Sequence, residues 1–405
     1  MRSKVLRLVL AGIAAFAGLV VPAAAQVRVE VDPSHRFQTF RDWEATANLQ
    51  FAPEIAPVVD RVFDLMLDEA GITRLRVGVF SGDEKPRNAM RDFLDRTIGM
   101  PDWKRLRYNT INDNADPFDL NMAGFDFADL DWKVENVFLP MRAKAEARGQ
   151  KLAFNLNYVG FTADLAGGDY HHTNPEEYAE FVLAAFLHLD TVYGIVPEYF
   201  EPLLEPDMVK EWSPALLGQA VAAAVRRLEA AGYQPKLLGP SVTNAANAVE
   251  WFDALVADPL VAGRMAELSY HRYRGGKPLV LQAIADRAAV AGIPSAMLEF
   301  FNGKGTYPVL HSDLAIANAA SWQGRAVTGY YKAEGDALTP FEDVRYNLEY
   351  MKVIRPGSVR VAATSNDATV SPLAFVGADG RMAVVMMVEA AGEVALSGLP
   401  SGAYR

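Results

Sequence analysis

Two glutamates in similar surroundings are the residues of this sequence best suited to chemistry. Glu205 follows a short apolar and aromatic stretch, residues 196–204, and is itself followed by a proline. Proline has no backbone N–H to give to a sheet, so a strand should end there and a loop should begin. Glu299 also ends a short apolar run and precedes an aromatic and glycine loop, residues 300–303. We therefore expect both side chains at the carboxyl ends of buried strands.

Two carboxyl groups brought together can divide a hydrolysis between an acid and a nucleophile. In retaining glycoside hydrolysis they lie about 5–5.5 Å apart; one attacks the anomeric carbon, and the other donates and then takes back a proton. The acid must keep its proton near neutral pH, so burial or a neighbouring negative charge must raise its pKa. A lone Glu-Pro is more simply a solvated loop acid, but two glutamates that each end an apolar strand favour a catalytic pair.

The rest of the chain predicts the elements that must bring these side chains together. Strand-like runs such as 72–80 and 151–158 alternate with helical stretches, several of them closed by a glycine. Counting from Thr39 gives eight candidate strands, the last at 326–331 after a helix over 310–322. This alternation indicates a parallel α/β fold, and eight units favour a closed (β/α)8 TIM barrel. No Gly-x-Gly-x-x-Gly motif or phosphate loop occurs, which argues against an open nucleotide-binding sheet.

The N-terminal segment differs from the barrel, which we expect over residues 39–348. Residues 1–25 are typical of a signal peptide, because basic residues and an apolar stretch at 8–21 precede Ala23-Ala24-Ala25. We therefore expect cleavage after Ala25 and a secreted or periplasmic protein. A retained N-terminal anchor is the alternative.

A small all-β module is expected from the two ends of the mature chain. Residues 349–405 contain short valine-rich runs between glycine turns, which is typical of strands in a sandwich. Residues 26–38 begin with an alternating strand pattern, and we expect this N-terminal strand to pair into the C-terminal region. The module is predicted to be a partial β-sandwich.

Charge and composition limit the partners. The 405 residues carry a net charge of −11 at pH 7, which disfavours nucleic acid or an anionic membrane as a partner. Nothing after the signal segment resembles a membrane span. The sequence has no cysteine, which excludes disulfides, thiolate nucleophiles and cysteine–zinc sites. We expect a monomer.

We expect neither a metal nor a cofactor. His171 and His172 are adjacent, but no third ligand follows with a recognisable spacing. The acidic segment 113–131 lacks the EF-hand pattern, so a solvated loop is favoured over a calcium site. A serine esterase finds no support, because no Gly-x-Ser-x-Gly motif occurs.

With its strands and glutamates in this order, the sequence resembles the barrel glycosidases that carry an acid/base on the fourth strand and a nucleophile on the seventh. Within that clan it is most similar to family thirty, the glucosylceramidase and endoxylanase group. In that group a strand before the barrel pairs with a C-terminal β-sandwich. The likeness covers most of residues 27–405. Its motifs are short: Pro175-Glu176-Glu177 at a helix start, His271-Arg272-Tyr273 on the sixth strand, and Arg76 on the second.

The resemblance implies an exported retaining glycoside hydrolase that acts on a β-linked glycan or glycoconjugate. Glu205 would be the acid/base and Glu299 the nucleophile. Arg76 would orient Glu299 and favour its charged form, although a structural ion pair is the plainer role. His271 and Tyr273 would touch the nucleophile or the sugar, although a satisfied core histidine is the plainer role for His271. Further candidates for substrate contact are Asn157, Tyr158 and Trp43.

Two places depart from the family pattern. Leu204 stands where an asparagine normally binds the sugar 2-hydroxyl, and residues 41–44 replace a glycine-rich turn after the first strand. Because leucine makes no such hydrogen bond, a carbohydrate-binding pseudoenzyme on the same barrel is the alternative function. A structural envelope protein is a third hypothesis, and it predicts that the two glutamates lie far apart or point away from one another.

Overall fold

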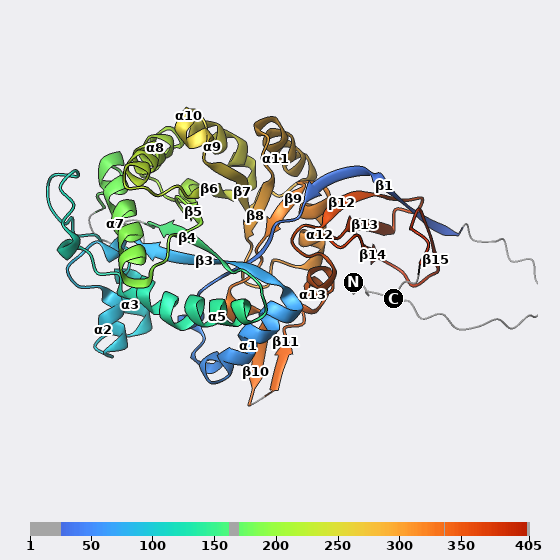
Figure 1. The fold of residues 1–405 in the computed structure, drawn as a ribbon, viewed down its shortest axis with the longest axis horizontal. Helices are drawn as coiled ribbons and strands as arrows, with labels where there is room; N and C mark the ends of the chain where they lie inside the picture. Colours follow the sequence, from blue (N-terminus) through green and yellow to red (C-terminus); the bar gives the residue numbers. More distant parts are fainter. Residues whose placement is uncertain (1–25, 162–169, 336, 403–405) are drawn as a thin grey trace, which may run out of the picture. The chain divides into compact units, whose positions relative to one another are not determined.

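The structure is a computed structural model that describes residues 26–161, 170–335 and 337–402. The predicted signal peptide lies outside these residues. The chain divides into two compact units (Figure 1). One is Asp42–Val344, and the other joins the segment up to Arg41 with the segment from Arg345. Within the described residues, no helix has both the length and the apolar character needed to cross a membrane.

The first unit is a closed barrel of eight parallel strands, which confirms the predicted (β/α)8 fold. Its last strand returns to its first through the pairs Asp42↔Ser321 and Trp43↔Trp322. Because all eight strands are parallel, their carboxyl ends meet at one face of the barrel. In order, the strands are β2 (Asp42–Thr46), β3 (Ile72–Phe80), β4 (Ala153–Val159), β5 (Tyr199–Glu201), β6 (Lys236–Asn244), β7 (Met265–Arg274), β8 (Ser295–Glu299) and β9 (Ala319–Trp322).

Helices surround this barrel (Figure 1). The ends of the longest described helix follow the expected signals. Asn174 Oδ1 caps the longest helix by accepting from the Glu176 backbone N–H at 3.0 Å, and Gly194 closes it in the left-handed conformation with φ of 62°. Among the described residues of this unit, the α-helices are α1 (Val59–Leu65), α2 (Ala89–Leu94), α3 (Met100–Leu106), α4 (Ala128–Lys133), α5 (Leu139–Ala147), α7 (Pro175–Tyr193), α8 (Pro214–Ala230), α9 (Ala248–Leu255), α10 (Pro259–Ala262), α11 (Pro278–Ala291) and α12 (Tyr307–Ala315).

The eighth barrel strand was predicted at the wrong place. Residues 326–331 form a 3-10 turn, Val327–Gly329, and the start of the hairpin β10 (Tyr331–Glu334) and β11 (Ala337–Pro340). The barrel closes instead through β9, inside the segment expected as a helix. A strand of four residues is too short for its hydrophobic period to be distinguished from a helix end. Trp322 is therefore a strand residue and not part of a helix core.

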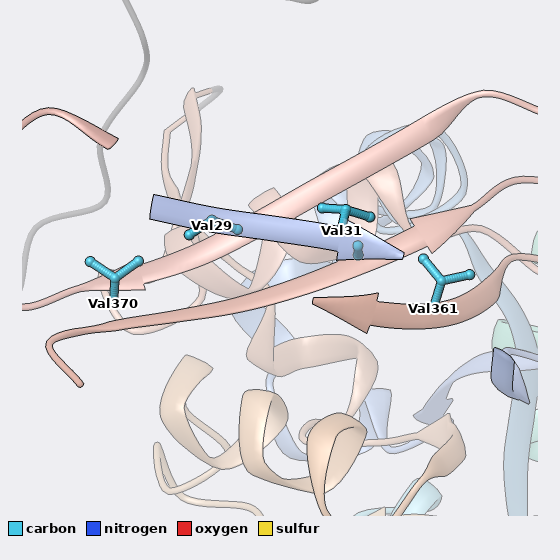
Figure 2. Close-up of a cluster of buried hydrophobic side chains, with 5 residues drawn as sticks. Val29, Val31, Val361 and Val370 are labelled. Carbon is cyan, nitrogen blue, oxygen red and sulfur yellow. The ribbon is translucent and has the colours of Figure 1, made fainter. Parts of the chain in front are cut away.

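The second unit is a five-stranded sheet with the order β14-β13-β12-β1-β15. Strand β1 (Val27–Thr39) lies between β12, to which it runs antiparallel, and β15, to which it runs parallel, which confirms that the N-terminal strand joins the C-terminal module. Valines from both ends of the chain make its buried core: Val29, Val31, Val361 and Val370 (Figure 2). The remaining elements are β12 (Val359–Ser365), β13 (Val370–Val376), β14 (Met382–Val388), β15 (Val394–Ser397) and the helix α13 (Arg345–Val353).

Candidate active site

Glu205 is held beyond the end of its strand by the two neighbouring strands. Strand β5 ends at Glu201 and not at Glu205, because Pro202 interrupts the ladder. The chain nevertheless stays between β4 and β6: the Leu204 N–H donates to the Tyr158 carbonyl at 2.9 Å, and the Glu205 N–H donates to the Ser241 carbonyl at 3.1 Å. Glu205 itself has a φ of 51°. A non-glycine residue in this region costs about 1–3 kcal/mol, and such residues cluster at functional sites.

The barrel brings the two predicted glutamates together. Glu205, His271 and Glu299 each offer one oxygen or nitrogen atom, and these three atoms all lie within 4.8 Å of one another. Glu299 is the last residue of β8, and its side chain is 9 % exposed, while that of Glu205 is 13 % exposed. This proximity contradicts the separation that the envelope-protein hypothesis requires. The arrangement resembles the spacing of about 5–5.5 Å between the carboxyl groups of retaining glycosidases.

Glu299 is fixed by two donors. Arg76, at the middle of β3, forms an ion pair with Oε2, and the Tyr273 hydroxyl donates to Oε1 at 2.8 Å. The Arg76 guanidinium is oriented in turn by its Nε–H bond to the Thr46 hydroxyl at 3.1 Å. Burial and the negative charge of Glu299 raise the pKa of Tyr273, so this hydroxyl keeps its proton. The nucleophile candidate therefore accepts hydrogen bonds at both oxygens.

Glu205 is hydrogen-bonded by a positively charged histidine. Nδ1 of His271 lies 3.0 Å from Oε1 of Glu205, and the imidazole is fully buried. Burial alone would lower the pKa of His271, but the carboxylates of Glu201, Glu205 and Glu299 raise it to about 9. At neutral pH the ring is thus an imidazolium and donates to Glu205.

Glu201 is a site residue that the sequence interpretation missed. It is fully buried, and its Oε1 lies 3.6 Å from a terminal nitrogen of Arg76 and 3.9 Å from Nε2 of His271. Burial raises its pKa, but the charges of Arg76 and His271 outweigh this effect and lower it. The sequence does contain a signal for Glu201, because a charged residue in an apolar strand needs a partner. In addition, Glu-Pro occurs twice within residues 201–206.

Three residues that we expected to touch substrate are buried in the structure. Asn157 is 2 % exposed and lies inside the barrel, where its side-chain amide donates to the Glu201 carbonyl at 3.4 Å. Trp43 and Tyr158 are fully buried, so neither has a free face for a sugar. Trp43 meets Trp322 edge-on, and Tyr158 packs against Tyr178 and Phe181 of α7.

The alternation of strand residues explains this outcome. Successive side chains of a strand point to opposite faces. The neighbour of Trp43, Glu44, binds Arg74 and Asn155 inside the barrel, and this turns the Trp43 side chain outward. The same rule turns Tyr158 toward α7, since Asn157 points inward.

Leu204 forms part of an apolar wall beside Glu205. It packs against a cluster of buried side chains from the ends of β3 and β4 and from the long segment after β3: Phe80, Tyr108 and Val159, with Phe161. An asparagine at this position would offer an amide, whereas Leu204 offers only carbon. The surface next to Glu205 therefore lacks a hydrogen-bond donor at this position.

Of the two adjacent histidines, His172 has protein partners at both ring nitrogens. His172 is fully buried; its Nδ1 lies 2.5 Å from the Tyr158 hydroxyl, and its Nε2 contacts Glu84. Among the described residues, three metal-ligating side chains converge only at Glu205, His271 and Glu299. Both oxygens of Glu299 already have protein partners there, Arg76 and Tyr273.

Comparisons with known proteins identify the fold. No protein-family model and no curated protein matches the chain. Among solved structures, an endo-β1,6-glucanase is 15 % identical with a TM-score of 0.65, over 93 % of this chain and 90 % of that one.

Two more structures agree with this likeness. SrfJ from Salmonella typhimurium is 14 % identical with a TM-score of 0.64, over 90 % of this chain and 86 % of that one. The catalytic domain of GH30 xylanase C from Talaromyces cellulolyticus is 15 % identical with a TM-score of 0.59, over 89 % and 86 %. At these identities the likeness establishes the fold: this chain shares the architecture of glycoside hydrolase structures, GH30 xylanases among them.

Proposed function

We propose that the protein is an exported retaining glycoside hydrolase that cleaves a β-linked glycan or glycoconjugate. The observation that carries this proposal is the approach of Glu205 and Glu299, whose oxygens lie within 4.8 Å although Glu205 follows β5 and Glu299 ends β8. This distance is shorter than the roughly 6.5–9.5 Å that separates the carboxyl groups of inverting enzymes, which place a water between them. It therefore favours a double displacement.

The two steps assign one role to each glutamate. In the first step, a carboxylate oxygen of Glu299 attacks the anomeric carbon while Glu205 gives its proton to the departing glycosidic oxygen. In the second step, Glu205 takes a proton from water, the water oxygen bonds to the anomeric carbon, and Glu299 leaves. His271 occupies Oε1 of Glu205 throughout, so the other oxygen is the one that transfers the proton.

The substrate class rests on the structural neighbours. They include a GH30 xylanase and an endo-β1,6-glucanase, which act on carbohydrates. One neighbour of TM-score 0.63 is a conserved exported protein from Bacteroides fragilis, which agrees with export directed by residues 1–25. Three further residues border the glutamate pair. We assign Arg76 to the binding of the nucleophile Glu299, His271 to the binding of the acid Glu205, and Tyr273 to the binding of the sugar.

Leu204 supports a second candidate, a carbohydrate-binding pseudoenzyme. Its side chain packs in the apolar cluster of Phe80, Tyr108 and Val159 and offers no hydrogen bond to a sugar. A protein of this kind would keep the cleft and bind sugars without hydrolysis.

Turnover of a panel of aryl β-glycosides decides between the two functions. The hydrolase is expected to release the aryl alcohol from at least one sugar, and proton NMR of the first product should give the β-anomer. An initial α-anomer would refute the retaining mechanism. Retained sugar binding without release of the aryl alcohol would instead support the pseudoenzyme.

A further inference from the structure

A chain of alternating charges joins the two proposed catalytic glutamates through the barrel interior. It runs from Glu205 to His271, then to Glu201, then to Arg76, and ends at Glu299. The first three links span 3.0, 3.9 and 3.6 Å, and the last is a direct ion pair. Glu201 is the central anion, and it is the only member of the chain that the proposed reaction steps and substrate contacts leave without a role.

One oxygen of Glu201 faces both cations. Its Oε1 lies near Arg76 and near His271, and within the described part of the chain this oxygen accepts no hydrogen bond. The opposite nitrogen, Nε2 of His271, likewise has no hydrogen-bond partner among the described residues. Both groups are completely buried. A buried charge without a counter-charge is strongly unfavourable, so Glu201 stabilises both cations as a shared counter-charge, beside Glu205 for His271 and Glu299 for Arg76.

We propose that Glu201 is a positioning residue of the catalytic site, which holds His271 charged and oriented against Glu205 and keeps Arg76 aligned on Glu299. This inference rests on the proposed function, because it gives Glu201 its effect through the two glutamates. Glu201 itself is shielded from substrate by its full burial.

The charged groups around His271 determine the pH at which its imidazole loses its positive charge. Glu201 and Glu205 approach the imidazole from the β5 segment, and Glu299 approaches from β8. Arg76 on β3 reaches Glu201, and Tyr273, on the same strand as His271, has its ring centroid 6.3 Å from the imidazole. Once Glu201 is neutral, only the two catalytic glutamates remain as counter-charges. The imidazolium then becomes less stable, and its proton leaves at a lower pH.

The test is the titration of His271 in the full-length protein with isotope-labelled histidine, followed by NMR. The H271N variant identifies the signal by its loss. In E201Q the midpoint of His271 is expected to fall by about one pH unit or more. The alkaline limb of kcat/KM should move down with it, and kcat should fall about tenfold or more while KM changes less.

Glu267 provides a matched control. It is equally buried inside the barrel and pairs with Arg74 instead of the catalytic residues, so E267Q should leave the His271 midpoint unchanged. E201D keeps the charge and should restore the midpoint most of the way. An unaltered His271 midpoint in folded E201Q would overturn the proposal.

Two further outcomes keep the inference separate from the proposed function. If E201Q does not fold, the wild-type titration still decides: a His271 midpoint at or below the ordinary 6.5 would overturn the proposal. If E205Q and E299Q hydrolyse as fast as wild type, the proposed function fails, whereas the His271 midpoints still report whether Glu201 holds the imidazolium.

Discussion

Nδ1 of His271 lies 3.0 Å from Oε1 of Glu205, and this contact joins a buried imidazolium to the proposed acid/base. The contact has two consequences. It orients the Glu205 carboxyl group by a hydrogen bond to Oε1. It also places the titrating charge of His271 next to Glu205, whose protonation the reaction requires. Several predictions about pH and about single substitutions depend on it.

The first prediction concerns the stability of the fold. The pKa of His271 is raised from 6.5 to about 9, so the folded protein holds this proton more tightly than the unfolded chain. The resulting stabilisation, on the order of 3 kcal/mol, is complete below pH 6.5 and is lost as the pH rises through about 9. Urea unfolding near pH 6 and near pH 10 measures it.

Removal of the imidazole should flatten this dependence. In H271N the loss of unfolding free energy between pH 6.5 and pH 9 is expected to be smaller than in wild type. His35 is exposed on β1 of the other unit, so H35N serves as the control and should keep the wild-type slope. Parallel curves for H271N and wild type would contradict the prediction.

The second prediction separates the roles of the two glutamates. E299Q should lose more than about 10⁴-fold in kcat on every aryl glycoside, because no covalent intermediate forms. E205Q should lose about 10²- to 10⁴-fold on substrates with poor leaving groups and much less on activated ones, because only the former need protonation. Rates against leaving-group pKa measure the difference.

An exposed glutamate supplies the control for both variants. Glu250 lies on α9 at the surface, and E250Q should keep wild-type rates. Equal losses for E205Q on all leaving groups would refute its role as the acid.

The barrel could be predicted because its signals are local. Glycine-closed helices and apolar strands of five or more residues, such as Ile72–Phe80, carry enough periodicity to be recognised alone. Strand β9 has four residues and was mistaken for the end of a helix. Its identity depends on pairing with β2 across the closed barrel, which is not a property of its own sequence.

The two glutamates of the site could be predicted from their local sequence, whereas the direction in which strand side chains point could not. Glu205 and Glu299 follow from their places before a proline and before a glycine loop. Trp43 and Tyr158 were assigned to the cleft as aromatic residues, but this barrel fills its interior with charged and amide groups such as Glu44 and Arg74. The aromatic side chains therefore pack outward. Glu201 was missed because its two cations come from β3 and β7, which only closure brings to it.

The third prediction tests the donor to Glu299. The Tyr273 hydroxyl donates to Oε1 of Glu299 at 2.8 Å and accepts from the Phe301 backbone N–H at 3.1 Å. A hydrogen bond to a charged group contributes about 1.5–3 kcal/mol, so Y273F should lower kcat/KM about 10- to 100-fold. Steady-state kinetics on an aryl glycoside measure this loss.

A second tyrosine makes a similar contact away from the site. The Tyr233 hydroxyl donates to Asp190 at 2.8 Å, so Y233F removes the same kind of bond and should leave kcat/KM unchanged. Comparable losses in Y273F and Y233F would mean that the effect is on stability and not on Glu299.

The last prediction concerns Leu204. Asparagine here would bring an amide next to Glu205, at the expense of packing against Phe80 and Val159. L204N should therefore unfold about 1–3 kcal/mol more easily, because an apolar contact is lost and a polar group is partly buried. If wild type is an active hydrolase whose substrate packs against the Leu204 side chain, L204N should hydrolyse its best substrate more slowly. If wild type binds sugars without hydrolysis, L204N should gain turnover. Chemical unfolding and the aryl glycoside panel, applied to both proteins, distinguish these results, and unchanged rates would mean that the Leu204 side chain does not contact the substrate.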